Sequence, residues 1–145
     1  MDTASAPAIA APAPADLSTP EASVRSYLEW ISYAYRVVDS QVASAVMDPW
    51  EWVRVDAYIE KNRQESRGID QRLIGFEVLG ITSSDSTATV ETAEEWTYRY
   101  FGPDGVPIGD ELTARYSVRY SVLKDAERSE WLVEKVDATP QGEVE

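Results

Sequence analysis

The second half of the sequence repeats with a period of two residues, and this pattern restricts the fold more than any other feature. Apolar and polar side chains alternate along 87–101 and 112–123, as they do in half-buried β-strands. Shorter runs from Gln71 and from Trp131 add two further strands, and Gly-, Pro-, Asp- and Ser-rich segments separate all four. Consecutive strands joined by short turns predict an antiparallel four-stranded sheet between 71 and 138.

The alternation also predicts which side chains share a face. In the first strand Ile74, Phe76 and Val78 have the same parity, so we expect all three to share one face of the sheet. The two long strands place mainly aromatic residues on one parity: Trp96, Tyr98, Tyr100, Tyr116 and Tyr120. On the opposite parity, acidic and basic residues of the two strands are expected to form cross-strand pairs on a solvated face: Glu91, Glu95, Arg99, Arg115 and Arg119.

The first half carries helix signals. Ser18 or Thr19 can cap a helix whose first residue is Pro20. The apolar residues that follow recur at helical spacing: Val24, Leu28, Ile31, Tyr35 and Val38. These positions predict an amphipathic helix that covers one face of the sheet.

A short helix over 42–47 and a second long helix are expected next. Asp48 can cap the long helix, and Glu51 can reach back to it as the reciprocal partner of a capping box. The helix is expected to continue to about Arg67, where Gly68 is a natural stop.

Composition removes many classes of function. The chain has 26 acidic and 13 basic residues, and this net charge of −13 repels nucleic-acid phosphates and anionic lipid surfaces. It has neither cysteine nor histidine, which removes disulfides, thiolate chemistry and the commonest general base and metal ligand. No run approaches the roughly 20 apolar residues of a membrane span. We therefore expect no cofactor, metal, nucleic acid or direct membrane insertion.

The ends of the chain differ from its middle. Residues 1–18 are almost entirely Ala, Pro, Ser, Thr and Asp, a composition that predicts a disordered linker. We expect the folded domain to span 19–138 and an acidic disordered tail to occupy 139–145. The Ala/Pro-rich linker is compatible with a tether between a membrane anchor encoded upstream and an extracytoplasmic domain; the alternative location is the cytoplasm.

Several segments together resemble the nuclear transport factor 2-like superfamily. They are the helix TPEASVRSYLEWI, the strands ATVETAEEWTYRY and ELTARYSVRYSVLK, and the closing strand SEWLVEKVDA. The arrangement is most similar to a branch found in membrane-anchored bacterial proteins and in the intermembrane-space domain of a chloroplast division protein. This resemblance implies an α+β fold in which two or three N-terminal helices pack on a curved four-stranded antiparallel sheet, the cystatin-like cone.

The resemblance implies two kinds of function. Its enzymatic members, which include dehydratases, ketosteroid isomerases and polyketide cyclases, place Asp, His and Tyr inside the cone. This chain has no His, and no Asp has the inward parity on its central strands. Glu94 has that parity if the strand is regular and would form an acid/base pair with Tyr116 or Tyr120, whereas a bulge would turn Glu94 outward. No residue is therefore assigned a catalytic role.

The inward aromatic residues have three interpretations: core packing, a protein-binding surface or the wall of a ligand pocket. The candidate ligand- or partner-binding residues are Tyr27, Trp30, Glu94, Trp96, Tyr98, Tyr116 and Tyr120. The leading hypothesis is a non-enzymatic protein-interaction or accessory domain, displayed outside the cytoplasmic membrane, with a protein partner or a second copy of the chain. The alternative is a domain of the isomerase or cyclase kind that binds a small apolar ligand inside the cone.

Overall fold

The computed structural model describes residues 10–141, and the parts of the predicted linker and tail at 1–9 and 142–145 lie outside the described residues. The helices are α1 (Pro20–Val37), the 3₁₀-helix η1 (Ser40–Val46) and α2 (Pro49–Gln64). The strands are β1 (Gly68–Ser83), β2 (Thr87–Phe101), β3 (Pro107–Asp125) and β4 (Glu130–Pro140). Each strand pairs antiparallel with the next in the order β1-β2-β3-β4. The predicted α+β meander is confirmed.

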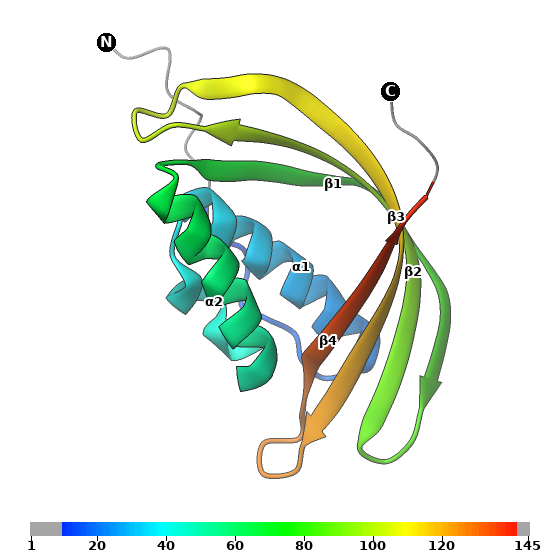
Figure 1. Cartoon of the computed structure of the whole chain (residues 1–145). Coiled ribbons are helices and arrows are strands. Elements are labelled where there is room, and N and C mark those ends of the chain that lie inside the picture. The colour runs from blue at the N-terminus through cyan, green and yellow to red at the C-terminus, as the bar shows by residue number, and fades with distance from the viewer. Residues whose placement is uncertain (1–9, 142–145) are drawn as a thin grey trace.

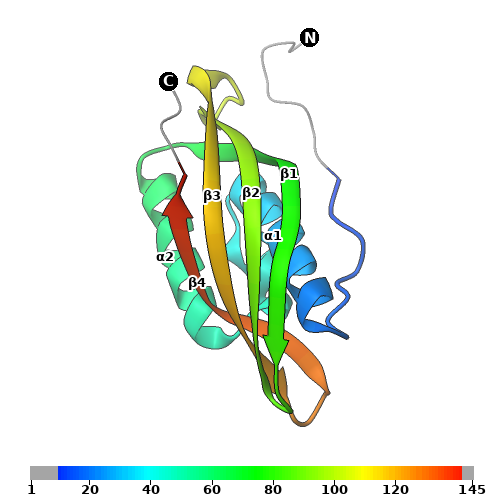
Figure 2. The same cartoon turned by 90° about the vertical axis from the view of Figure 1, so that its right-hand side faces the viewer.

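The sheet is strongly curved, and its concave side holds the helices (Figure 1). Viewed onto the other side, the four strands lie in front and α1 and α2 lie behind them (Figure 2). Val24 of α1, Val55 of α2, Val90 of β2 and Val133 of β4 are fully buried in the core between these layers. One face of the sheet is therefore covered by helices, as the alternating pattern requires.

The first helix begins as predicted. Thr19 Oγ1 accepts a hydrogen bond from the Ala22 amide at 3.1 Å, and Pro20 occupies the first turn. The helix ends one residue before Val38, which adopts a left-handed conformation with φ of 57° and donates its amide to Ala34. The predicted stripe is buried at its first three positions, Val24, Leu28 and Ile31.

The start of α2 differs from the predicted capping box. Asp48 caps the helix by accepting from the Trp50 amide at 3.0 Å. Its own amide, however, donates to the Val133 carbonyl of β4 at 2.8 Å, so the group that Glu51 was expected to bind is already occupied. Glu51 instead turns into the protein, where only 2% of its surface is exposed.

The end of α2 also corrects a prediction. The helix stops at Gln64 rather than near Arg67, and Ser66 takes the left-handed conformation, with φ of 57°, in the turn that follows. Gly68 is the first residue of β1. A Cβ at this position would lie 2.4 Å from Cζ of Phe101, so this glycine makes room for an aromatic ring across the strand pair.

Two bulges in β1 explain why one predicted facing is wrong. The register with β2 shifts between Leu73 and Gly75 and again between Val78 and Gly80, so Ile74 and Leu79 have no partner in β2. Each extra residue reverses the alternation. Phe76 and Val78 both pack on the core, but Ile74 is 56% exposed, so it does not share their face as predicted.

The remaining boundaries move by a few residues. β3 starts at Pro107, inside the segment predicted as a loop, and the predicted short helix at 42–47 is the 3₁₀-helix η1. Thr139 and Pro140 pair with Ser117 and Tyr116 at the end of β4. At the other end, the Leu17 carbonyl accepts from the Trp131 amide at 2.9 Å. The two terminal segments thus contact the domain where they join it.

Candidate functional site

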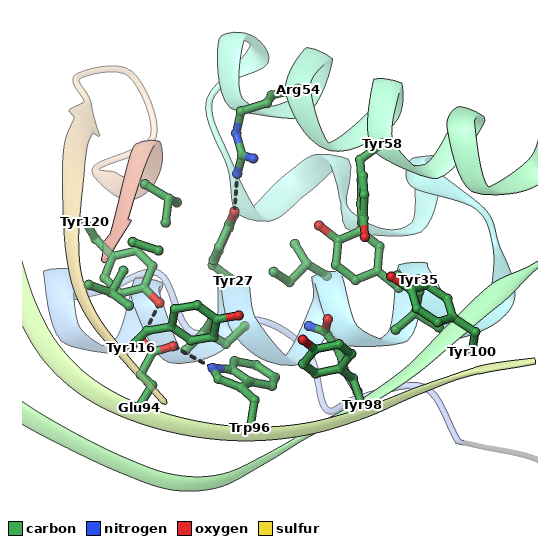
Figure 3. Close-up of a pocket in the computed structure, with 17 residues that line it drawn as sticks. Tyr27, Tyr35, Arg54, Tyr58, Glu94, Trp96, Tyr98, Tyr100, Tyr116 and Tyr120 are labelled. Atoms are coloured by element: carbon green, nitrogen blue, oxygen red, sulfur yellow. Dashed lines mark hydrogen bonds between the residues drawn. The ribbon is translucent and has the colours of Figure 1, made fainter. Parts of the chain in front are cut away.

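A cavity of about 410 Å³ lies between the helices and the concave face of the sheet (Figure 3). Seven of the chain's eight tyrosines line it. They come from both helices and both central strands: Tyr27, Tyr35, Tyr58, Tyr98, Tyr100, Tyr116 and Tyr120. Trp96 and the polar residues Arg54, Gln71 and Glu94 complete much of the wall. The cone interior is therefore open and rich in phenol groups.

Six of the seven predicted site residues line this cavity: Tyr27, Glu94, Trp96, Tyr98, Tyr116 and Tyr120. The seventh, Trp30, lies on α1 outside the cavity wall. Its ring packs edge-to-face on Tyr33, with centroids 5.8 Å apart. Whether the six residues bind a ligand or a partner stays a prediction, but the fold brings them together.

Sequence reasoning missed several members of the wall. Tyr35 was expected only as part of the helical core stripe, and Tyr58 belongs to no strong apolar pattern on α2. These two rings pack edge-to-face, with centroids 5.6 Å apart. Their meeting depends on how α1 and α2 pack together, which the periodicity of a single helix does not encode. The abundance of tyrosine was the available signal, since eight occur in 145 residues.

The open question about Glu94 is resolved by the regularity of β2. Pairing with β3 is unbroken from Thr87 to Tyr98, and the shifts in pairing with β1 result from extra residues on β1. β2 therefore keeps its alternation through Trp96, and Glu94 faces inward with 5% of its surface exposed.

Three donors hold the Glu94 carboxylate. Its Oε2 accepts from Thr92 Oγ1 at 2.7 Å and from the Tyr120 hydroxyl at 2.5 Å, and its Oε1 accepts from Trp96 Nε1 at 2.8 Å. Thr92 and Trp96 lie two residues away on the same strand, so they share its face. All three neighbours donate, so both carboxylate oxygens act as acceptors. The neighbours thus fix this group in place at the wall of the cavity.

A second buried carboxylate, Glu51, is held differently. It accepts from the Tyr27 hydroxyl at 2.5 Å, and the Arg54 guanidinium binds both of its oxygens. An oppositely charged partner with several hydrogen bonds compensates the cost of burying a carboxylate. Glu51 therefore has a cationic partner on α2 itself.

The two carboxylates are linked through tyrosine rings. Tyr27, which binds Glu51, packs edge-to-face on Tyr120, which binds Glu94, with ring centroids 6.1 Å apart. Burial, and then the nearby charge of Glu94, raise the pKa of Tyr120. Burial and the charge of Glu51 likewise raise the pKa of Tyr27 well above its usual range. Both phenols are therefore neutral hydrogen-bond donors at physiological pH.

Burial also affects two other tyrosines of the cavity wall. It raises the pKa of Tyr35 to about 12. It raises the pKa of Tyr116 as well, followed by the effect of neighbouring Tyr98. The cavity thus offers neutral phenols that can donate or accept hydrogen bonds, together with one anionic group, Glu94.

The outer face of the sheet carries the cross-strand pairs predicted from the sequence. Arg119 binds Glu91 at 2.9 Å, and Arg115 lies 3.7 Å from Glu95. Arg99 donates instead to the Gly109 carbonyl at 3.2 Å. Exposed ion pairs of this kind contribute little to stability. This face of the sheet is therefore a charged surface in contact with solvent.

Residues 10–141 contain neither a cluster of metal-ligating side chains nor a membrane-spanning helix. No group of three or more acidic side chains there could hold a metal ion. No helix in this part of the chain is long and apolar enough to span a bilayer.

Solved structures show where this fold occurs. The intermembrane space region of chloroplast protein ARC6 superposes with a TM-score of 0.70 at 20% identity, over 87% of this chain and 98% of that chain. A ketosteroid isomerase-like protein from Erwinia carotovora atroseptica gives 0.58 at 18% identity, over 88% and 97%. A cystatin-like domain from Nostoc punctiforme gives 0.51 at 13% identity, over 86% and 78%.

No protein-family model and no curated protein sequence matches the chain. The structural similarities, all below 25% identity, show the fold: the chain has the α+β cone of these proteins. The fold is shared by a region in the chloroplast intermembrane space and by a ketosteroid isomerase-like protein. One fold commonly serves unrelated functions. The function therefore has to be inferred from the residues that line the cavity.

Proposed function

We propose that this domain binds a small organic molecule inside the cone. The observation that carries the proposal is the cavity of about 410 Å³ walled by seven tyrosines and Glu94. Ligand pockets commonly measure about 300 to 1,000 Å³ and combine aromatic walls with a few placed polar groups. Protein interiors are otherwise close-packed, with few voids larger than a water molecule. If the aromatic residues served only as core, they would be expected to fill this space.

The chemistry of the wall favours a ligand with an apolar, planar part. Trp96 and the tyrosine rings offer flat apolar surface, and phenol hydroxyls offer hydrogen bonds at its edges. The polar side chains at the wall are themselves held by neighbours: Gln71 donates to Ser32 on α1 at 3.0 Å, and Glu94 accepts from three residues. Held side chains lose little freedom on binding, which favours affinity.

Protein interaction remains the second candidate, because α2 exposes apolar side chains that no described residue covers. Trp50 is 81% exposed and Val53, one turn later, is 56% exposed. Trp is among the residues enriched at protein interfaces. The similarity to the ARC6 intermembrane space region is compatible with this role and with an extracytoplasmic domain on a tether. A membrane-spanning helix encoded upstream in the full gene would support that location, and its absence would remove it.

Ligand binding is tested with a neutral aromatic probe, benzyl alcohol, by protein NMR. The indole N–H of Trp96 reports on the cavity because it binds Glu94 at the wall. We expect the probe to shift this resonance and those of the other lining residues. Tyr116→Ala should weaken binding about tenfold, as expected for loss of roughly 1.4 kcal/mol. Tyr33→Ala is the matched control, since Tyr33 is the one tyrosine outside the wall.

Two results would contradict the proposal. One is an absence of saturable shifts at Trp96 and its neighbours in the folded protein. The other is a pattern of shifts centred on Trp50 and Val53, which would transfer the binding role to the exposed face of α2.

A further inference from the structure

The charge balance around the cavity is uneven. Glu51 is neutralised by Arg54, which binds both of its oxygens. Glu94 is equally buried, yet all three of its hydrogen bonds come from neutral groups, and none of the ion pairs formed by residues 10–141 includes it. A buried carboxylate ordinarily requires a compensating cation. Glu94 therefore places an uncompensated negative charge beside an open space.

Glu94 also has room for one more donor. An ionised carboxylate has about four acceptor positions, two on each oxygen. Oε2 uses both of its positions, for Thr92 and Tyr120, whereas Oε1 has only Trp96. The vacant acceptor position is on Oε1 of Glu94, a residue that lines the cavity. An N–H or O–H of a bound molecule can occupy it.

The surrounding rings favour a positive charge at this place. The faces of tyrosine and tryptophan attract cations, and aromatic cages recognise organic ammonium ions in this way. One ring of the wall already does so within the chain, since the Arg67 guanidinium lies 4.1 Å from the centroid of Tyr100. The net charge of −13 additionally raises the concentration of cations near the protein.

We propose that the ligand of this cavity is an organic ammonium ion, which donates an N–H to Oε1 of Glu94 while tyrosine and tryptophan rings surround its charge. The proposal rests on the proposed function and names the ligand class. Arg54 does not oppose it, because its charge is already balanced by Glu51. A carboxylate ligand would face Glu94 without a compensating group.

Three probes with one skeleton separate charge from shape: benzylammonium, benzyl alcohol and benzoate. We would measure their affinities by isothermal titration calorimetry at a fixed, physiological ionic strength. We expect benzylammonium to bind at least about tenfold more tightly than benzyl alcohol, a difference of roughly 1.4 kcal/mol. Benzoate should bind more weakly than either.

Two variants assign the preference to Glu94. Glu94→Gln removes the charge and should reduce the preference for benzylammonium to within about twofold of benzyl alcohol. Glu95→Gln is the matched control, because it removes the same charge from the adjacent residue, which pairs with Arg115 on the outer face. It should leave the preference unchanged. If Glu94→Gln fails to fold, the three-probe comparison on the unaltered protein, read at the Trp96 indole resonance, still decides the question.

The outcomes are distinct. Equal affinity for benzylammonium and benzyl alcohol would overturn the ammonium proposal and leave ligand binding in place. Equal loss of preference in both variants would also overturn it, because the attraction would then come from overall charge. Binding of none of the three probes would overturn both proposals.

Discussion

Gly68 allows a stringent test of how β1 packs on β2. A Cβ at this position would lie 2.4 Å from Cζ of Phe101 and 2.9 Å from both of its Cε atoms. Carbon atoms in contact sit about 3.5–4.0 Å apart, so in Gly68→Ala the ring must retreat by about 1 Å. Phe101 is buried, and the Arg36 guanidinium lies 4.6 Å from its ring centroid. Displacing the ring would therefore disturb both its buried packing and its contact with Arg36.

Overpacking of this kind costs about 1–3 kcal/mol. For a domain of this size, 1 kcal/mol lowers Tm by roughly 2–4 °C, so Gly68→Ala should lower Tm by about 2–12 °C. Thermal unfolding followed by circular dichroism measures this change. Gly80→Ala is the matched control in the same strand, because a Cβ at 80 meets nothing within 4 Å. Its Tm should stay within about 2 °C of the parent, as for a surface substitution.

A double variant isolates the clash. In a Phe101→Leu background the smaller side chain leaves room, so Gly68→Ala should cost at least about 1 kcal/mol less than it does in the parent. Equal melting temperatures for Gly68→Ala and Gly80→Ala would refute the reasoning, as would strict additivity with Phe101→Leu.

Three further predictions concern the helices and the tyrosines. Tyr27→Phe removes the hydroxyl that donates to Glu51, and it should lower the free energy of unfolding, measured by urea denaturation, by about 1.5–3 kcal/mol. The control Tyr33→Phe lies outside the cavity and should change this free energy by less than about 0.5 kcal/mol. Equal effects of the two substitutions would contradict the hydrogen bond between Tyr27 and Glu51. Thr19→Ala should cost about 1 kcal/mol in the same assay through loss of the α1 cap, and Thr19→Ser should not, because serine caps equally well. Because the pKa of Tyr35 is raised from 10.0 to about 12, the unfolded chain releases this proton first, so stability is unaffected below pH 10 and falls between pH 10 and 12. Phenolate absorbance should then rise together with loss of circular dichroism, whereas ionisation of all eight tyrosines in a folded protein would contradict the burial.

The elements that local physics determines were predicted from the sequence. Thr19 with Pro20 and Asp48 with Pro49 start their helices as expected, because a cap depends only on residues within one turn. The four strands and their order follow from alternation and turn residues. Predictions were wrong where a residue distant in the sequence determines the orientation of a side chain. Glu51 faces inward because Val133 of β4 occupies the Asp48 amide, and this contact joins segments far apart in the sequence.

The site was predicted in part for a similar reason. Parity on β2 and β3 brought Glu94, Trp96 and the strand tyrosines to one face, since alternation is a property of each strand. Parity does not say whether facing rings fill the interior or leave it open. That depends on the separation of helices and sheet, so the cavity and the contributions of Tyr35 and Tyr58 emerge only from the structure.

The two bulges of β1 also affect how the protein meets other chains. β1 is an edge strand, and it exposes large apolar side chains at Ile74, Leu79 and Ile81. A long, flat edge of this kind would recruit another strand and begin aggregation. The extra residues at 74 and 79 shift the register with β2. Because bulges bend and twist the strand that carries them, an incoming strand cannot keep one register along this edge. The bulges that interrupt the alternation of β1 thereby protect this edge of the sheet from pairing with strands of other chains and from aggregation.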